Sequence, residues 1–143
     1  MSRVKDIIAD RDLYSVEPHL TVSEVAHRMA ELHVGAILVI KRGELQGIFS
    51  ERDFLVRVVV GGRDPSATSV ADVMTSSVAT IDESVSMEDA METMRIHNCR
   101  HLPVMRQDSV VGFLSMRDLM NYALEQKDDE LHHMRAYIHG SGH

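Results

Sequence analysis

The apolar residues of this chain change their spacing at regular points, and these changes predict the elements. Between Thr21 and Gly35 they recur every three or four positions, which is the spacing of one helical face. Thr21 is a suitable N-cap, because its hydroxyl can accept a hydrogen bond from a free amide of the first turn. The run Ala36–Ile40 is continuously apolar, as in a strand covered on both faces. A K-R-G-E turn then leads to the returning strand Leu45–Phe49, so the two are predicted to form a hairpin.

A second helix is expected after this hairpin. It begins at Glu51 and stops at Gly61, since paired glycines are typical of a helix terminus. The side chains expected to face inward are Phe54, Leu55, Val58 and Val59. The predicted unit is therefore helix, strand, strand, helix, preceded by a short amphipathic segment over residues 1–9 with Val4, Ile7 and Ile8 on one side.

The whole unit occurs twice. G-I-F-S-E-R-D at Gly47–Asp53 returns as G-F-L-S-M-R-D at Gly112–Asp118, 65 residues later (112 − 47 = 65). Two copies at this period are unlike a solenoid, so we expect two half-domains that complete one core. In the second copy Pro103 has no backbone N–H, which predicts an edge strand or a position that faces away from a partner strand. The expected boundaries are 1–62 for the first copy, 63–69 for a linker, 70–126 for the second copy and 127–143 for a C-terminal helical extension and tail.

The segment after Gln126 has no counterpart in the first copy. Leu131, Met134 and Ile138 lie at helical spacing, and the acids at its start suit a helix N-terminus. We therefore expect a last helix, closed by Gly140. Its apolar stripe fits an oligomer contact and packing against its own domain equally well.

Composition sets limits on core, compartment and partners. At 143 residues and 44% hydrophobic the chain can bury an ordinary core, and without Trp that core must be aliphatic and methionine-rich. The stripe of Met87, Met91 and Met94 fits core packing better than an adaptable binding surface, although both are open. A net charge of −7 argues against general nucleic-acid binding. Cys99 is the single cysteine, which indicates a reducing cytoplasm, and no secretion signal or membrane span is predicted.

No catalytic or metal signature is found. G-x-S-x-G, H-E-x-x-H and P-loop patterns are absent, so the sequence predicts no enzyme. The chain has nine histidines, and none of their spacings matches a closed zinc site. The histidines considered for metal binding are His132, His133, His139 and His143.

The repeated S-x-R-D motif has two explanations. In the first it is a capping box, in which Ser and Asp satisfy free amides of the helix that follows. In the second, the helix N-terminus attracts phosphate and the carboxylate accepts hydrogen bonds from a diol such as ribose. Arg52 and Arg117 favour the second explanation, because a capping box does not need the arginine that could bind phosphate.

With the R-H-L-P-V run Arg100–Val104 and the V-A-D-V-M-T segment before the second copy, these motifs make the chain resemble a tandem pair of CBS domains, or Bateman module. The resemblance covers about residues 4–125. It implies an α/β (α+β) fold in which two pseudo-twofold-related repeats, each helix-strand-strand-helix, pack sheet to sheet. A C-terminal helix is added to this core.

The resemblance also implies two clefts for adenosine-containing ligands, in which the motif acid holds the ribose and the opposite repeat supplies a wall. The residues expected in the first cleft are Ser50, Arg52, Asp53, Thr80 and Ile81. Those expected in the second are Ser115, Arg117, Asp118, Ser15 and Val16. Arg100 and His101 stand where the first copy has Gly35-Ala36. They either face solvent or the other repeat, or reach phosphates and make the clefts unequal.

By resemblance the protein is expected to be a regulatory module that binds AMP, ADP or ATP, with AMP and ATP most favoured, NAD(H) possible and S-adenosylmethionine less favoured. It would signal to an effector protein in trans or through a homodimer, whose orientation the sequence leaves open. The alternative is a structural or interaction module whose clefts bind nothing.

Overall fold

The computed structural model describes the backbone of residues 2–141 and the side chains of residues 2–136. The predictions made for the side chains of Ile138 and His139, and for His143, lie outside the described residues. The first half of the chain contains β1 (Ser15–Val16), α2 (Val22–Leu32), β2 (Ala36–Lys41), β3 (Glu44–Ser50), α3 (Glu51–Asp53) and the π-helix η1 (Phe54–Val60). The second half contains β4 (Ile81–Asp82), α4 (Met87–His97), β5 (His101–Arg106), β6 (Ser109–Ser115) and α5 (Met116–Ser141). The short helices α1 (Val4–Ile8) and η2 (Val70–Asp72) precede the two halves.

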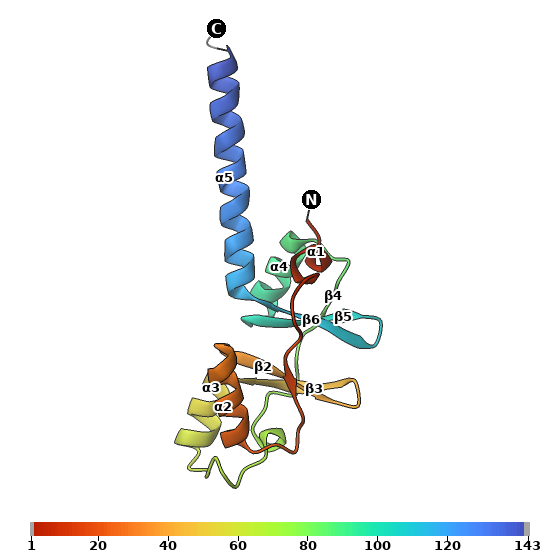
Figure 1. The fold of residues 1–143 in the computed structure, drawn as a ribbon, viewed down its shortest axis with the longest axis vertical. Helices are drawn as coiled ribbons and strands as arrows, with labels where there is room; N and C mark the ends of the chain where they lie inside the picture. The colour runs from red at the N-terminus through yellow and green to blue at the C-terminus, as the bar shows by residue number, and fades with distance from the viewer. Residues whose placement is uncertain (1, 142–143) are drawn as a thin grey trace.

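The two halves pack sheet to sheet, as expected. Their strand orders are β1-β2-β3 and β4-β5-β6, with antiparallel hairpins and a short parallel strand added to each. Figure 1 shows the hairpins lying between outer layers of helices. Apolar side chains of both sheets meet at their interface, among them Leu38, Ile48 and Phe113. The predicted fold class is confirmed.

The first helix of each half is held by equivalent caps. The Thr21 hydroxyl accepts a hydrogen bond from the Glu24 amide at 3.2 Å, as predicted, and Ser86 caps α4 in the same way. Each helix ends at a residue in the left-handed region, His33 at φ 56° and Asn98 at φ 49°. The expected end at Gly35 was therefore two residues late, because the helix already turns at His33.

The segments that lead into each half pack on the opposite half. Val4 and Ile8 of α1 belong to the second core, where the Val4 amide donates to the Val85 carbonyl at 2.9 Å. Val70 and Val73, which precede the second half, belong instead to the first core. Each core is thus completed by residues that come before the other copy in the chain.

Close approaches at two equivalent glycines hold these crossed segments in place. Ile48 and Thr75 form an antiparallel bridge, with reciprocal backbone hydrogen bonds of 2.9 and 2.8 Å. A Cβ atom on the neighbouring Gly47 would lie 2.5 Å from the Thr75 carbonyl oxygen. A Cβ atom on Gly112 would lie 2.5 Å from Cδ1 of Ile8. Only glycine allows the segments to lie this close to the hairpins.

The helix after the first hairpin ends at Gly61 as predicted, but most of it is a π-helix. Phe54 and Val58 face inward, whereas Leu55 is 57% and Val59 is 54% exposed. The inward orientation predicted for these two residues was wrong. The apolar face of η1 is wider than the surface on which the helix packs, so part of it stays exposed.

Two further predictions are corrected. α5 runs unbroken from Met116 to Ser141, so there is no separate last helix and Gly140 does not end it. The reason is that the sequence between Met116 and Ile138 contains no Gly or Pro to interrupt the helix. For Pro103 only the first alternative, an edge strand, is wrong, because β5 is the central strand. β4 pairs only with Val104 and Met105, so Pro103 lies outside the paired part on that side, in agreement with the second alternative.

Over the residues that the structure describes, no helix is both long and apolar enough to cross a bilayer.

Substituting the two glycines should separate a backbone clash from a side-chain clash. Gly47→Ala should lower the free energy of unfolding by about 2–3 kcal/mol, because the Thr75 backbone must move away from β3. Gly112→Ala should cost less, about 1 kcal/mol, because the atom that clashes most is the end of the Ile8 side chain and the rest of Ile8 must give only slightly. Urea unfolding of both variants measures the difference. Equal losses would show that the backbone around Thr75 moves as easily as the Ile8 side chain.

Candidate functional site

A cleft of about 1350 Å³ lies between the two halves. One wall is formed by the first turns of α3 and η1 together with residues 75 and 77–79. These residues belong to segment 73–80 between η2 and β4, which is called the linker from here on and is distinct from the linker predicted at 63–69. The other wall is formed by the end of α4, the start of β5 and the first turns of α5. The cleft is large enough for a nucleotide-sized ligand.

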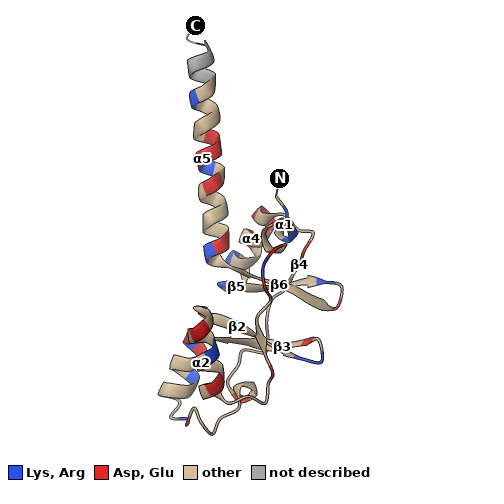
Figure 2. Ribbon diagram, viewed as in Figure 1, with Lys and Arg blue, Asp and Glu red and all other residues tan. Residues whose placement is uncertain are grey.

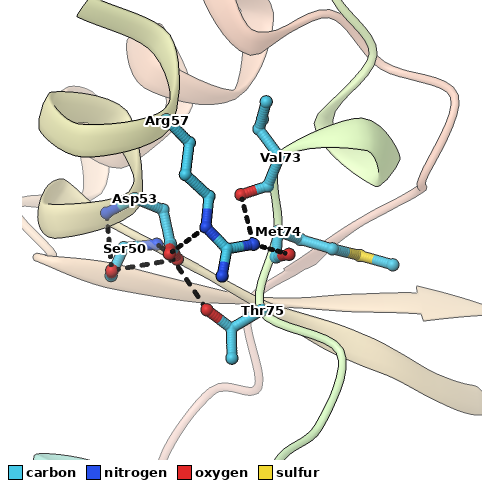
Figure 3. A network of polar contacts seen from close by, with 6 residues as sticks. All are labelled: Ser50, Asp53, Arg57, Val73, Met74 and Thr75. Carbon is cyan, nitrogen blue, oxygen red and sulfur yellow. Dashed lines mark hydrogen bonds and ion pairs between the residues drawn. The ribbon is translucent and has the colours of Figure 1, made fainter. Parts of the chain in front are cut away.

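Asp53 lies on the first wall and is almost fully hydrogen-bonded (Figure 3). Its carboxylate accepts from the Ser50 amide and hydroxyl, each at 3.0 Å, while the Asp53 amide donates to Ser50 Oγ at 3.2 Å. The capping box predicted for the motif is therefore present. The other carboxylate oxygen accepts from Thr75 Oγ1 at 2.9 Å and lies 3.7 Å from Nε of Arg57. Asp53 is only 8% exposed, so this network fixes its orientation toward the linker.

Arg57 connects the same network to the linker backbone. It lies one helical turn after Asp53, and its guanidinium donates to the Met74 carbonyl at 2.6 Å and to the Val73 carbonyl at 3.4 Å (Figure 3). The position of the linker and the orientation of the carboxylate therefore depend on each other.

The second copy repeats the capping box but gives its aspartate a different partner. The Ser115 amide donates to Asp118 at 2.8 Å, and the Asp118 amide donates to Ser115 Oγ at 3.2 Å. The remaining carboxylate oxygen lies 2.8 Å from the guanidinium of Arg11. Burial alone raises the pKa of Asp118, but the hydrogen bonds from Arg11 and Ser115 and the charge of Arg11 outweigh it and hold the pKa below its ordinary value.

The cleft carries more positive than negative side chains although the chain is acidic overall. Its cationic residues are Arg52, Arg57, Arg95 and Arg100, against the acids Glu51 and Asp53. Among the described side chains, Arg52 and Arg100 form no ion pair, so both are available to an anion.

His101 stacks on Phe113, with ring centroids 5.2 Å apart. Burial is the main reason that its pKa is lowered, and Arg100 lowers it further while Asp118 and Glu51 oppose the shift. The imidazole is therefore neutral at pH 7, and Arg100 rather than His101 supplies positive charge at this end of the cleft.

The structure brings only part of the predicted site together. Ser50, Arg52, Asp53, Arg100 and His101 line the cleft. The predicted residues that do not line it are Thr80, Ile81, Ser15, Val16, Ser115, Arg117 and Asp118. Ile81 and Val16 begin or extend short strands and point into the two hydrophobic cores, which removes them from the cleft wall. Of the region predicted for this wall, Val78–Ile81, the structure places Val78 and Ala79 in the cleft together with Ser77, but not Thr80 or Ile81.

Sequence reasoning missed Arg57, Thr75 and Arg11. Arg57 could have been found from the sequence, because it lies four residues after Asp53 on a predicted helix, and side chains at this spacing lie on the same face and can form an ion pair. Thr75 and Arg11 could not, since each meets its aspartate only through tertiary packing. Met91 was considered for either core or surface, and it lines the cleft while Met87 is buried in the core.

Within residues 2–136, no group of three or more His, Cys, Asp and Glu side chains is arranged to hold a metal ion.

The CBS domain family matches residues 4–60 and 70–125. This chain therefore belongs to the CBS-domain family and contains two CBS domains. It is 35% identical over 130 residues to CBS domain-containing protein YhcV of Bacillus subtilis, an alignment that covers 91% of this chain and 89% of that protein. It is 34% identical over 125 residues to CBS domain-containing protein CBSX3, mitochondrial, of Arabidopsis thaliana. That alignment covers 84% of this chain but 61% of the relative, so the chain spans less than two thirds of that protein's length.

Solved structures show the same fold. The crystal structure of the CBS domain protein NE2398 superposes with a TM-score of 0.81 at 32% identity, covering 86% of this chain and 98% of that one. CBS domain protein PAE2072 from Pyrobaculum aerophilum, solved in complex with AMP, superposes with a TM-score of 0.74 at 29% identity. The superposition covers 82% of this chain and 89% of the PAE2072 chain.

Replacing Arg11 should change the titration of Asp118. Arg11→Ala should raise the pKa of Asp118, because the variant loses the hydrogen bond and positive charge that lower it. A lowered carboxyl pKa stabilises the fold above the unfolded-state value of about 3.9, and this contribution is lost as pH falls through the folded-state pKa. The variant should therefore be less stable than the wild type at pH 7, and the two should converge in acid.

Carbon-13 NMR titration of the Asp118 carboxyl measures its pKa. Urea unfolding at pH 7 and at acid pH measures the difference in stability between the variant and the wild type. Arg28→Ala, at an exposed position on α2, is the control and should leave the Asp118 titration unchanged. An unshifted Asp118 in Arg11→Ala would contradict the ion pair.

Proposed function

We propose that this protein is a regulatory module that binds an adenosine-containing ligand in the cleft bearing Asp53 and transmits the occupancy to a partner. The observation that carries the proposal is the cleft itself, in which a fixed carboxylate lies at a helix N-terminus among uncompensated arginines. The AMP bound by the related protein PAE2072 supports this ligand class. AMP and ATP are the first candidates, followed by NAD(H) and S-adenosylmethionine.

In the proposed complex Asp53 accepts hydrogen bonds from the ribose diol. The Asp53 oxygen that accepts from Thr75 Oγ1 in the structure is the one that accepts from the ribose in the complex. A ribose hydroxyl therefore replaces the Thr75 hydroxyl as the partner of this oxygen. Arg52 and Arg100 are placed on opposite walls of the cleft and bind the phosphates. Because both halves contact the ligand, binding favours one relative packing of the two over another.

The two motif aspartates are not equivalent in this proposal. Asp53 meets a neutral hydroxyl, whereas Asp118 meets the Arg11 guanidinium, a stronger competitor for any ribose. We therefore assign the Asp53 cleft as the main ligand site. The ion pair at Asp118 favours the alternative function, a purely structural capping box, for the second motif alone.

The proposed module acts in a reducing cytoplasm, by binding rather than by catalysis, and as a homodimer. Exposed apolar side chains on η1 and α5 support self-association, because monomeric proteins rarely leave such contiguous surfaces uncovered. The exposed residues concerned are Leu55, Val56, Val59 and Val60 on η1 and Met116, Met120 and Leu124 on α5. The effector protein would bind in trans.

Asp53→Asn tests the ligand directly, because the amide keeps the size of the side chain and an oxygen for capping. AMP, ATP, NAD(H) and S-adenosylmethionine are titrated calorimetrically into the wild type, Asp53→Asn and Asp118→Asn. A true ligand should lose roughly 10- to 100-fold in affinity in Asp53→Asn, the value of hydrogen bonds to a charged group. Asp118→Asn should change the affinity much less.

At 100 times its dissociation constant the ligand should stabilise the wild type by roughly 2.7 kcal/mol. The melting temperature should then rise by about 5–11 °C. No rise with any of the four ligands, in protein freed of carried-over nucleotide, would favour the interaction module instead.

Arg100→Ala tests the phosphate contact. AMP should bind more weakly to the variant by roughly 10-fold, whereas adenosine should bind both proteins alike, since a charge-assisted contact is lost only for the phosphate. Arg28→Ala is the matched control for general charge. Equal losses for AMP and adenosine would place Arg100 away from the phosphate.

A further inference from the structure

The far part of α5 has an apolar stripe that nothing in the chain covers. α5 projects beyond all other elements (Figure 1), and its side chains from Lys127 to Ala136 are exposed. Leu131 is 50% and Met134 is 59% exposed. An isolated helical segment of this length is marginal in water, and most helices are stabilised by packing of their apolar face. The stripe therefore needs a partner.

The stripe has the spacing of a coiled-coil seam. Successive positions of the stripe are separated alternately by four and three residues. These positions are Met120, Leu124, Lys127, Leu131 and Met134, and all except Lys127 are apolar. With Leu124 and Leu131 at a positions, Met120 and Met134 occupy d positions. Leu119 and Tyr122, on another face of the helix, are buried against the body of the protein. α5 is thus held by one face and leaves the seam free.

We propose that α5 pairs with α5 of a second copy of this chain as a parallel, in-register two-stranded coiled coil. The inference rests on the homodimer of the proposed function, and it supplies the surface and orientation of that dimer. The seam spans only about two and a half heptads, so the coiled coil works together with the apolar patch on η1. Figure 1 shows η1 and α5 on the same side of the protein, which lets both contact one second copy.

Charge complementarity selects the parallel arrangement. Glu130 is at a g position and Arg135 at the following e position, and such residues meet between parallel helices, giving two attractive pairs per dimer. An antiparallel pairing of the same seam would instead bring Glu130 near Glu130 and Asp128 near Asp128 of the second copy. Like charges in these positions repel. Figure 2 shows both acidic and basic residues along the part of α5 that extends beyond the body.

Lys127 occupies the one polar d position of the seam. Polar residues at such positions reduce stability and specify register and orientation. In a parallel pair the ammonium of Lys127 lies beside Asp128 of the second copy, at the neighbouring e position, which offsets the charge within the seam. The lysine keeps the coiled coil weak enough to respond to changes in the body of the protein.

The parallel arrangement requires a head-to-head dimer. α5 extends along the direction that joins the two halves (Figure 1), so a twofold axis along two parallel α5 helices places like halves side by side. In a head-to-tail dimer the two α5 helices would point in opposite directions, so they could not form the parallel pair that the charges favour. Met116 and Met120 line the cleft at the start of the same helix, so a bound ligand contacts the element that forms the dimer.

The opposite face of α5 does not favour a membrane surface. That face carries Glu125 and Asp129, and Asp128 and Glu130 flank the seam itself, so acids on both sides of the helix would repel anionic lipid headgroups. A second copy presents both the apolar stripe and the complementary arginine, which an acidic membrane does not.

Disulfide trapping tests orientation and register in the full-length protein. In a Cys99→Ser background, Met134→Cys should form a disulfide-linked dimer on mild oxidation, because equivalent d positions face each other across a parallel coiled coil. Asp129→Cys, on the outer f position, is the matched control and should stay largely unlinked. A monomer in sedimentation at micromolar concentration, or equal cross-linking of the two variants, would overturn the proposal.

Charge reversal tests the selected contacts. Glu130→Arg and Arg135→Glu should each weaken dimerisation roughly fivefold, and the double variant should recover it. Lys127→Leu should tighten the dimer, because it fills the seam with an apolar side chain. No recovery in the double variant, or a weaker dimer in Lys127→Leu, would overturn the parallel pairing.

AMP titration of the same variants separates this inference from the ligand proposal. Trapped Met134→Cys dimers without AMP binding would support the coiled coil and overturn the ligand. AMP binding without trapping would overturn the coiled coil alone.

Discussion

The antiparallel bridge between Ile48 and Thr75 is the contact on which both the fold and the cleft depend. It ties the segment that leads into the second CBS domain to the first hairpin, and it is possible because Gly47 has no Cβ atom to meet the Thr75 carbonyl. The same bridge places Thr75 Oγ1 on the Asp53 carboxylate. A packing constraint between halves therefore also fixes the orientation of the candidate ligand-binding acid.

Duplication has produced two sites with the same local geometry and different chemistry. Both motifs form the same capping box, because the hydrogen bonds are set by residues three apart within each copy. Their outer partners come from the crossed lead-in segments, which differ: a neutral hydroxyl at Thr75 and a guanidinium at Arg11. In the proposed function a ligand competes more easily with the hydroxyl than with the guanidinium, which is why the Asp53 cleft is assigned as the main ligand site.

α5 connects this cleft to the surface of the protein. Its first turn carries the second motif, its next residues line the cleft, and its far part carries the exposed seam. A single continuous helix transmits displacement with little loss, because its backbone hydrogen bonds resist bending. In the proposed regulatory module, cleft occupancy and dimer geometry are thus two properties of one element.

The sequence by itself determined everything that depends on local spacing: the duplicated helix-strand-strand-helix order, the Thr21 cap, the hairpins, the capping boxes and membership of the CBS family. It failed where packing decides. The crossed segments, the exposure of Leu55 and the charge partner of Asp118 follow from contacts between distant residues, which no spacing reveals. The single helix α5, with 26 residues, is longer than predicted, because the change in composition after Gln126 introduces no residue that ends a helix. Only the tertiary structure decided which of the two equivalent motifs faces an open cleft, since the motifs are the same and their neighbours are not.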